Sequence, residues 1–221
     1  MRALLFGSIS TVADTSELQR AAFNAAFAEH QLDWQWEQKE YRAMLATSGG
    51  QDRIAAYAKS HGEQVDAQAV HARKSRLFQE SLEQAQLAAR DGVAETIREA
   101  KTNGLQVALV TTTSAENIAA LMNALPDVAA TDFDLVLDAA SVAQPKPAGD
   151  AYALALSSLG TSPADCVAIE DSVGGVQSAT AEGVTCVAFP NVNTTGHDFA
   201  AARARVERLD LDQLRSLIPN A

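Results

Sequence analysis

Short apolar runs alternate with helical patterns in the second half of this 221-residue chain, and no other feature constrains the fold as much. The apolar runs lie at residues 107–110, 135–137, 167–169 and 186–189. Helical periodicity predicts helices at residues 93–103, 115–124, 149–159, 173–182 and 210–217. This alternation predicts an α/β fold with a doubly wound parallel sheet, in which ligands bind at the carboxyl ends of the strands.

The amino-terminal half has a different texture. Residues 2–6, which are apolar after Arg2, form a further predicted strand that we expect to join the same sheet. From there to about residue 90 the pattern is helical, and it includes one long helix predicted over residues 70–89. We therefore predict a core domain of residues 1–14 and 91–221, with an all-helical cap domain of residues 15–90 inserted after the first strand.

Composition excludes several functional classes. The formal net charge is −11, and the acidic residues are spread along the chain, which argues against binding to nucleic acid or to an anionic membrane. No run approaches the ~20 apolar residues that a membrane-spanning helix needs. Cys166 and Cys186 lie in apolar runs, which fits a reducing compartment. We expect a cytoplasmic monomer with a small-molecule ligand.

Polar residues follow the predicted strands where each of them ends. Thr111 and Thr112 open a hydroxyl-rich turn that suits a phosphate oxyanion, although such a cluster also serves as a helix cap. Lys146 stands between two prolines and is either a fixed cation or an exposed loop lysine. Glu170 and Asp171 are adjacent carboxylates that suit magnesium, or they cap the next helix.

The order and spacing of these residues carry more information than any one of them. Thr111, Lys146 and the Glu170–Asp171 pair resemble the second, third and fourth motifs of the haloacid dehalogenase (HAD) hydrolase superfamily, and residues 170–183 resemble its subfamily IA signature. The resemblance covers essentially the whole chain and implies a Rossmann-like core. It also implies magnesium-dependent phosphatase chemistry, in which one aspartate attacks phosphorus and a second acts as the general acid and base.

The helical segment narrows the resemblance further. Its similarity is carried by residues 33–36, 41–42, 47–53 and 71–74. These segments resemble the cap of the CbbY-like group, which is similar to β-phosphoglucomutase and includes phosphatases acting on xylulose 1,5-bisphosphate. The ligand implied by this resemblance is a small phosphorylated sugar.

The turn after the first strand departs from the family pattern of Asp, any residue, Asp, Gly, Thr. Laid on that pattern, Gly7 stands in place of the nucleophile and Ile9 in place of the acid and base, while Ser10 replaces the glycine. Only Thr11 is retained. Removing groups that act as a unit lowers turnover by several orders of magnitude. We expect Ser8 to point away from the site, and neither Ser8 nor its neighbouring hydroxyls has an evident base beside it.

The resemblance assigns roles to the other positions. Thr111 and Thr112 would bind phosphate, and Lys146 would be the cation. Magnesium would be held by Glu170, Asp171 and the backbone carbonyl of Ile9, and its binding is expected to be weak or absent with one carboxylate fewer. The substrate contacts on the cap side would be Glu17, Arg42, Gly49, Gly50, Arg53, His71 and Lys74. Taken singly, the charged ones also read as solvated helix faces, and the glycine pair as a helix-breaking turn.

Three hypotheses follow. The chain is a HAD hydrolase homologue that binds a phosphorylated sugar but is catalytically impaired. Alternatively, it is an active magnesium-dependent hydrolase with altered chemistry that uses Asp14, Ser10 or a metal-bound water. The third hypothesis is a non-catalytic regulatory or interaction protein that retains the HAD scaffold.

Overall fold

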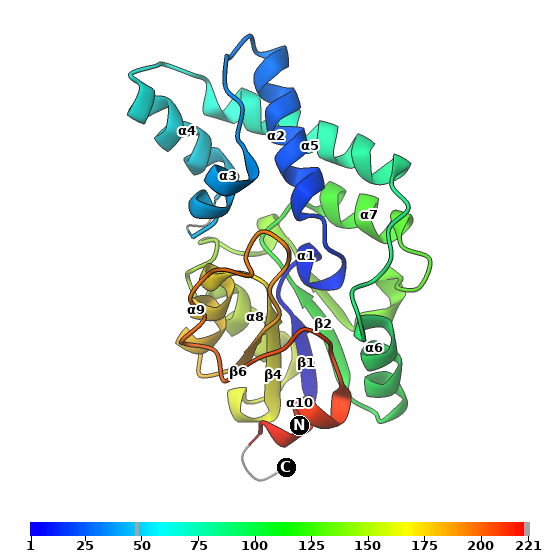
Figure 1. Ribbon diagram of the computed structural model, residues 1–221. Helices are drawn as coiled ribbons and strands as arrows, with labels where there is room; N and C mark the ends of the chain where they lie inside the picture. The colour runs from blue at the N-terminus through cyan, green and yellow to red at the C-terminus, as the bar shows by residue number, and fades with distance from the viewer. Residues whose placement is uncertain (47–48, 219–221) are drawn as a thin grey trace.

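The computed structural model describes residues 1–46 and 49–218, and within them six parallel strands form one sheet (Figure 1). The spatial order of the strands is β3-β2-β1-β4-β5-β6. Their bounds are Ala3–Phe6 (β1), Gln106–Val110 (β2), Leu135–Leu137 (β3), Cys166–Glu170 (β4), Thr185–Ala188 (β5) and Ala204–Arg205 (β6). The predicted doubly wound parallel sheet is therefore confirmed. The two-residue edge strand β6 was not predicted, because so short a segment carries no periodicity.

Four helices of the core precede or separate strands in the sequence and a fifth follows β6, and all five lie where the sequence pattern predicts them. They are α6 (Val93–Thr102), α7 (Ala115–Ala124), α8 (Asp150–Leu159), α9 (Val173–Ala181) and α10 (Leu211–Ser216), and single turns of 3-10 helix span Ala130–Asp132, Ala139–Ser141 and Pro163–Asp165. Helix α8 ends at Gly160, whose φ of 61° is the left-handed conformation that glycine adopts readily at a helix end.

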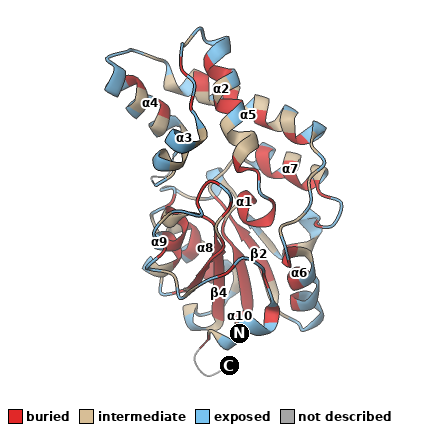
Figure 2. Cartoon of the chain, viewed as in Figure 1, coloured by how far each residue is buried: buried red, intermediate tan, exposed pale blue. Residues whose placement is uncertain are grey.

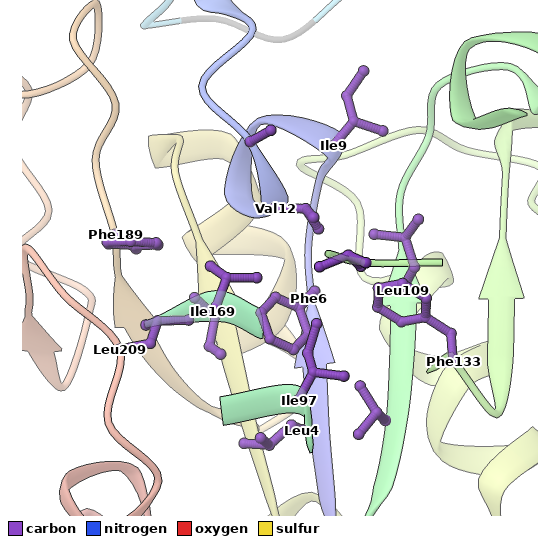
Figure 3. Packing of buried hydrophobic residues seen from close by; sticks show 14 of the residues in the cluster. Leu4, Phe6, Ile9, Val12, Ile97, Leu109, Phe133, Ile169, Phe189 and Leu209 are labelled. Atoms are coloured by element: carbon purple, nitrogen blue, oxygen red, sulfur yellow. The ribbon is translucent and has the colours of Figure 1, made fainter. Parts of the chain in front are cut away.

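Side chains alternate between the two faces of the sheet. Phe6 of β1 pairs in register with Leu109 of β2 and Ile169 of β4, and Figure 3 shows these three side by side in the cluster that α6 covers. The opposite face carries mainly small residues, such as Ala108 and Ala168, and packs against α8 and α9. Because small side chains let a helix approach closely, the second layer lies tightly on the sheet. Both faces are buried (Figure 2).

Within the segment between β1 and β2, four helices lie above the carboxyl ends of the strands (Figure 1). They are α2 (Ser16–Glu29), α3 (Gln38–Met44), α4 (Gly50–His61) and α5 (Ala67–Gln84). They share their own apolar cluster around the fully buried Trp36, which confirms an all-helical insertion after the first strand. The exact division of the chain at residues 14/15 and 90/91 stays a prediction.

One local prediction in this segment was wrong. The helix predicted over residues 70–89 begins at Ala67 and ends at Gln84, because the apolar stripe stops at Leu82 and the chain then runs back to the sheet. At the start of α2, Thr15 is the N-cap residue, but its side chain makes no capping hydrogen bond. Instead, the Asp14 carboxylate accepts the backbone N–H of Ser16 at 3.1 Å.

Among the described residues, no helix combines the length and the apolar character needed to cross a membrane.

Candidate functional site

A cavity of about 420 Å³ opens between the carboxyl ends of the strands and the inserted helices. Its lining includes residues from the ends of β1, β2 and β4 together with residues of α2, α4 and α5. The charged residues that line it fall into two groups. Lys146, Glu170 and Asp171 belong to the strand side, which we call the strand end of the cavity. Arg53, His71 and Lys74 belong to the helices, which we call the helical end.

At the strand end, the carboxylate of Glu170 lies against Gly7. Glu170 is fully buried, and a Cβ placed on Gly7 would lie 2.0 Å from its Oε1. On the other side of the carboxylate, a Cβ on Gly175 would lie 2.0 Å from Oε2. Two glycines therefore form a slot that the Glu170 carboxylate fills. Burial raises the pKa of Glu170, and the nearby Lys146 partly opposes that shift.

Lys146 is the counter-charge of Glu170. Its Nζ donates to the carbonyl of Gly7 at 2.5 Å, to the carbonyl of Val110 at 2.6 Å and to Glu170 Oε1 at 2.6 Å. The hydroxyl of Tyr152 donates to the same Oε1 at 2.7 Å. An ammonium group has three protons, and all three are used by the protein. Glu170 Oε2 has no hydrogen-bond partner among the described residues.

Asp171 is surrounded by hydrogen-bond donors. Its Oδ1 accepts the Ser8 hydroxyl at 2.6 Å and lies 3.5 Å from the Thr11 hydroxyl, while its Oδ2 accepts Nδ2 of Asn191 at 2.7 Å. The expectation that Ser8 points away from the site was wrong. Ser8 is the N-cap of α1 (Ile9–Val12), and this turn brings its hydroxyl to Asp171. The serine thus has a carboxylate beside it that the sequence did not reveal.

These donors bear on the implied magnesium site. Magnesium prefers an octahedron of oxygen ligands, usually including one or two carboxylates and several waters. Here both oxygens of Asp171 and Oε1 of Glu170 accept protein hydrogen bonds, and the carbonyl of Ile9 accepts the N–H of Ala13 at 3.0 Å. The described residues contain no cluster of three metal-ligating side chains. Three of the four carboxylate oxygens are thus engaged by protein donors, and only Glu170 Oε2 has no partner among the described residues, so these residues fit a magnesium ion poorly.

The turn after β2 contributes the neutral polar groups of the strand end. Thr111 is buried, and its hydroxyl accepts the N–H of Thr113 at 3.2 Å. Thr112 is half-buried, and both threonines line the cavity. Ser114 caps α7 by accepting the N–H of Asn117. The cluster therefore does cap a helix, and it also places two threonines at the cavity wall.

The helical end is basic. Lys74 of α5 is 4% exposed, and its Nζ donates to Oε1 of Gln19 at 2.9 Å and lies 4.7 Å from the ring centre of Phe23. Burial, followed by the charge of Arg53, lowers the pKa of Lys74 to about 7. Burial, followed by the charge of Lys74, lowers the pKa of His71 to about 4. None of the ion pairs between described residues includes Lys74.

The glycine pair at the start of α4 also lies at the helical end. Gly49 has a φ of 91°, and a Cβ on Gly50 would lie 2.6 Å from Nε2 of His71. Position 50 therefore leaves room for the histidine ring. Thr47 and Ser48, which belong to the segment resembling the CbbY-like group, lie outside the described residues.

Glu17 and Arg42 both form side-chain hydrogen bonds with Asn193. Nδ2 of Asn193 donates to Oε1 of Glu17 at 2.6 Å, and Nε of Arg42 donates to Oδ1 of Asn193 at 3.3 Å. Nε2 of His197 also lies 2.8 Å from the carbonyl of Arg42. These contacts join α2 and α3 to the loop that follows β5.

Sequence reasoning missed Asn191, Asn193 and Tyr152. The asparagines lie in a loop without periodicity, and Tyr152 reads as a core residue of α8. The two side chains that the sequence offered as alternative catalysts are engaged elsewhere. Asp14 accepts the N–H groups of Ser16 and Val192, and the Ser10 hydroxyl lies 2.8 Å from the hydroxyl of Thr15.

Comparison with known proteins shows which family the chain resembles. The family described as "Haloacid dehalogenase-like hydrolase" matches residues 10–189. Protein CbbY of Rhodobacter capsulatus is 40% identical over 213 residues, which cover 95% of this chain and 94% of that protein. Crystal structures of CbbY from Rhodobacter sphaeroides, one in complex with phosphate and one of a variant in complex with xylulose 1,5-bisphosphate, are each 36% identical and cover 94% of both chains, with TM-scores of 0.85 and 0.86. This chain belongs to the haloacid dehalogenase-like hydrolase family.

Proposed function

We propose that this protein binds a phosphorylated sugar in the cavity between the sheet and the inserted helices, and that its aspartyl-phosphate chemistry is disabled. The observation that carries the proposal is the cavity itself, which joins a hydroxyl-rich strand end to a helical end where the buried Lys74 has no ion-pair partner among the described residues. Burial lowers the pKa of Lys74 to about 7, and an anionic ligand beside it would favour its protonated form, so this position suits an anion. The CbbY structures bound to phosphate and to a bisphosphate sugar support the same ligand class.

The loss of turnover rests on Gly7 and Ile9. In the family pattern these positions carry the nucleophile and the acid and base, and neither residue can attack phosphorus or donate a proton. Glu170 does not replace the missing nucleophile, because its carboxylate is fully buried and held by Lys146 and Tyr152. Attack on phosphorus requires an exposed oxygen within reach of the ester. We expect rates lower by several orders of magnitude than those of an intact enzyme.

A second candidate function is a hydrolase with altered chemistry, and one observation favours it. The Ser8 hydroxyl donates to Asp171 at 2.6 Å, and Asp171 is oriented in turn by Asn191. A nucleophile, a base and a group that orients the base form the arrangement found in covalent catalysis. In such a reaction the Ser8 proton would pass to Asp171 as the serine oxygen bonds to phosphorus and the bond between phosphorus and the sugar oxygen breaks. The protonated Asp171 would give that proton to the departing sugar oxygen, and water would then hydrolyse the phosphoserine to release inorganic phosphate.

The test measures binding and turnover on the same protein. The ligands are a panel of sugar phosphates that includes xylulose 1,5-bisphosphate, and the readouts are the thermal midpoint and the release of inorganic phosphate. A ligand at 100-fold its Kd stabilises the fold by about 2.7 kcal/mol. In a chain of this size that corresponds to roughly 5–10 °C. We expect stabilisation by at least one sugar phosphate and no release of phosphate.

Three outcomes separate the candidates. If no sugar phosphate stabilises the protein, the proposed binding function is wrong. If the protein releases phosphate and Ser8→Ala abolishes the release, the serine mechanism replaces the main proposal. A Gly7→Asp, Ile9→Asp, Ser10→Gly variant that gains turnover while the natural chain has none would support a disabled phosphatase.

A further inference from the structure

The charges at the two ends of the cavity differ in a way that restricts the ligand. We infer that the phosphate of the ligand binds at the helical end, without magnesium, and that the strand end accepts uncharged sugar hydroxyls rather than a second phosphate. This inference rests on the proposed function and specifies its substrate class as a sugar monophosphate.

Lys146 is the cation of the strand end. Its three protons already go to two backbone carbonyls and to Glu170, at 2.5 to 2.6 Å. A phosphate could gain this cation only by displacing the Glu170 carboxylate, which would then be buried without its counter-charge. Leaving a buried charge unpaired costs several kcal/mol in general. The ion pair with Glu170 therefore competes with an anionic ligand.

The net charge of the strand end also opposes binding of a phosphate there. The carboxylates of Glu170 and Asp171 stand against the single ammonium of Lys146, so the side chains lining the strand end carry no net positive charge. Arg90 lies close enough to interact with Asp171, but it interacts with Asp14 as well, and its guanidinium donates to the carbonyls of Ser10, Phe189 and Pro190. A phosphate dianion beside Asp171 would be repelled unless a metal ion lay between them.

The contacts of Asp171 do not call for such a metal ion. The oxygens of Asp171 accept hydrogen bonds from Ser8 and Asn191, and these donors satisfy the carboxylate without a cation. Asp171 and the hydroxyls of Ser8, Thr111 and Thr112 offer acceptors and donors of the kind that bind sugar hydroxyls. At the helical end, by contrast, Lys74 and Arg53 line the cavity, and Lys74 is buried without an ion-pair partner among the described residues.

The experiment is isothermal titration of the full chain with inorganic phosphate, in EDTA and again in magnesium chloride at matched ionic strength. Two variants remove one cation each. Lys74→Met removes the buried lysine of the helical end, keeps the shape of the side chain and leaves Arg53 in place. Lys146→Met combined with Glu170→Gln removes the cation of the strand end together with its counter-charge, so that no buried charge is left unpaired. Thermal melting verifies that both variants fold.

We expect Lys74→Met to weaken phosphate binding about 10-fold or more, which corresponds to about 1.4 kcal/mol. The double variant should bind phosphate within about 3-fold of the natural chain, and magnesium should change neither result. A comparison of xylulose 5-phosphate with xylulose 1,5-bisphosphate should show that the second phosphate does not improve binding.

The opposite pattern would overturn the inference. Loss of binding in the double variant but not in Lys74→Met would place the phosphate at the strand end. Magnesium-dependent binding that disappears in Asp171→Asn would restore the metal site. Either result leaves a sugar-phosphate protein, so the proposed function would survive. Failure of inorganic phosphate and of every sugar phosphate to bind would overturn both.

Discussion

The carboxylate of Glu170 occupies the space into which a side chain at Gly7 would project, since a Cβ on Gly7 would lie 2.0 Å from Glu170 Oε1. The Glu170 carboxylate therefore restricts which side chain fits at position 7, although 162 residues lie between the two positions in the sequence. Under the proposed function, the nucleophile is not only missing from position 7, because the space for its side chain is also filled. An aspartate restored at position 7 would have to displace a buried, ion-paired carboxylate.

The first prediction follows from this contact. Gly7→Ala should destabilise the fold by about 1–3 kcal/mol, the usual cost of overpacking a buried site. Denaturant unfolding measures the effect. Gly196→Ala is the matched control, because a Cβ there meets nothing within 4 Å, and it should be nearly neutral. In a Glu170→Asp background, where the carboxylate is withdrawn by one methylene, the cost should fall. An equal cost in both backgrounds would contradict the contact as its cause.

The second prediction concerns the buried ion pair. Lys146→Met should destabilise the fold by about 3–5 kcal/mol, because it leaves the Glu170 carboxylate buried and unpaired. The same variant combined with Glu170→Gln should recover much of that loss. Lys101→Met serves as the control, since Lys101 pairs with Asp134 at the surface, and it should cost no more than about 1 kcal/mol. Equal effects of Lys146→Met and Lys101→Met would show that burial does not matter here.

The third prediction concerns pH. Burial lowers the pKa of Lys74 from 10.5 to about 7 in the folded protein. Between these two values the unfolded chain holds the proton and the folded chain does not, so the contribution of Lys74 to stability rises as pH rises from about 7 towards 10.5. Lys74→Met should remove this dependence and should stabilise the fold most below pH 7.

The measurement is the difference in unfolding free energy between the natural chain and Lys74→Met at pH 6.5 and at pH 9. Taking the difference cancels the other groups that titrate in this range. Lys59→Met, at an exposed position of α4, should show no such trend. A difference that is independent of pH would show that Lys74 keeps an ordinary pKa.

The fourth prediction concerns the link between the core and the inserted helices. The buried Asn193 donates to Glu17 and accepts from Arg42, and hydrogen bonds to charged groups contribute about 1.5–3 kcal/mol. Asn193→Ala should therefore increase amide hydrogen exchange in α3. Asn123→Ala, at an exposed position of α7, is the control and should leave exchange in α3 unchanged. Unchanged exchange in both variants would mean that other contacts hold α3.

The order of the core elements could be read from the sequence because it depends on local patterns. The apolar runs around Leu109 and Ile169 became β2 and β4, and the helices between them begin and end within three residues of their predicted bounds. The motif residues Thr111, Lys146 and Asp171 also came together at one cavity, since parallel strands end on the same side of a sheet. The direction of the Ser8 side chain could not be read in this way, because it depends on a four-residue turn.

The sequence by itself therefore determined the parallel sheet, the helical insertion and the absence of carboxylates from positions 7 and 9, because periodicity and residue identity are local properties. Only the tertiary structure decided which side chains pair with each other. The contacts of Glu170 with Gly7, of Ser8 with Asp171 and of Asn193 with Glu17 join residues that are far apart in the chain. Such contacts depend on how buried polar groups find partners once the layers are packed, and no single stretch of sequence records that outcome.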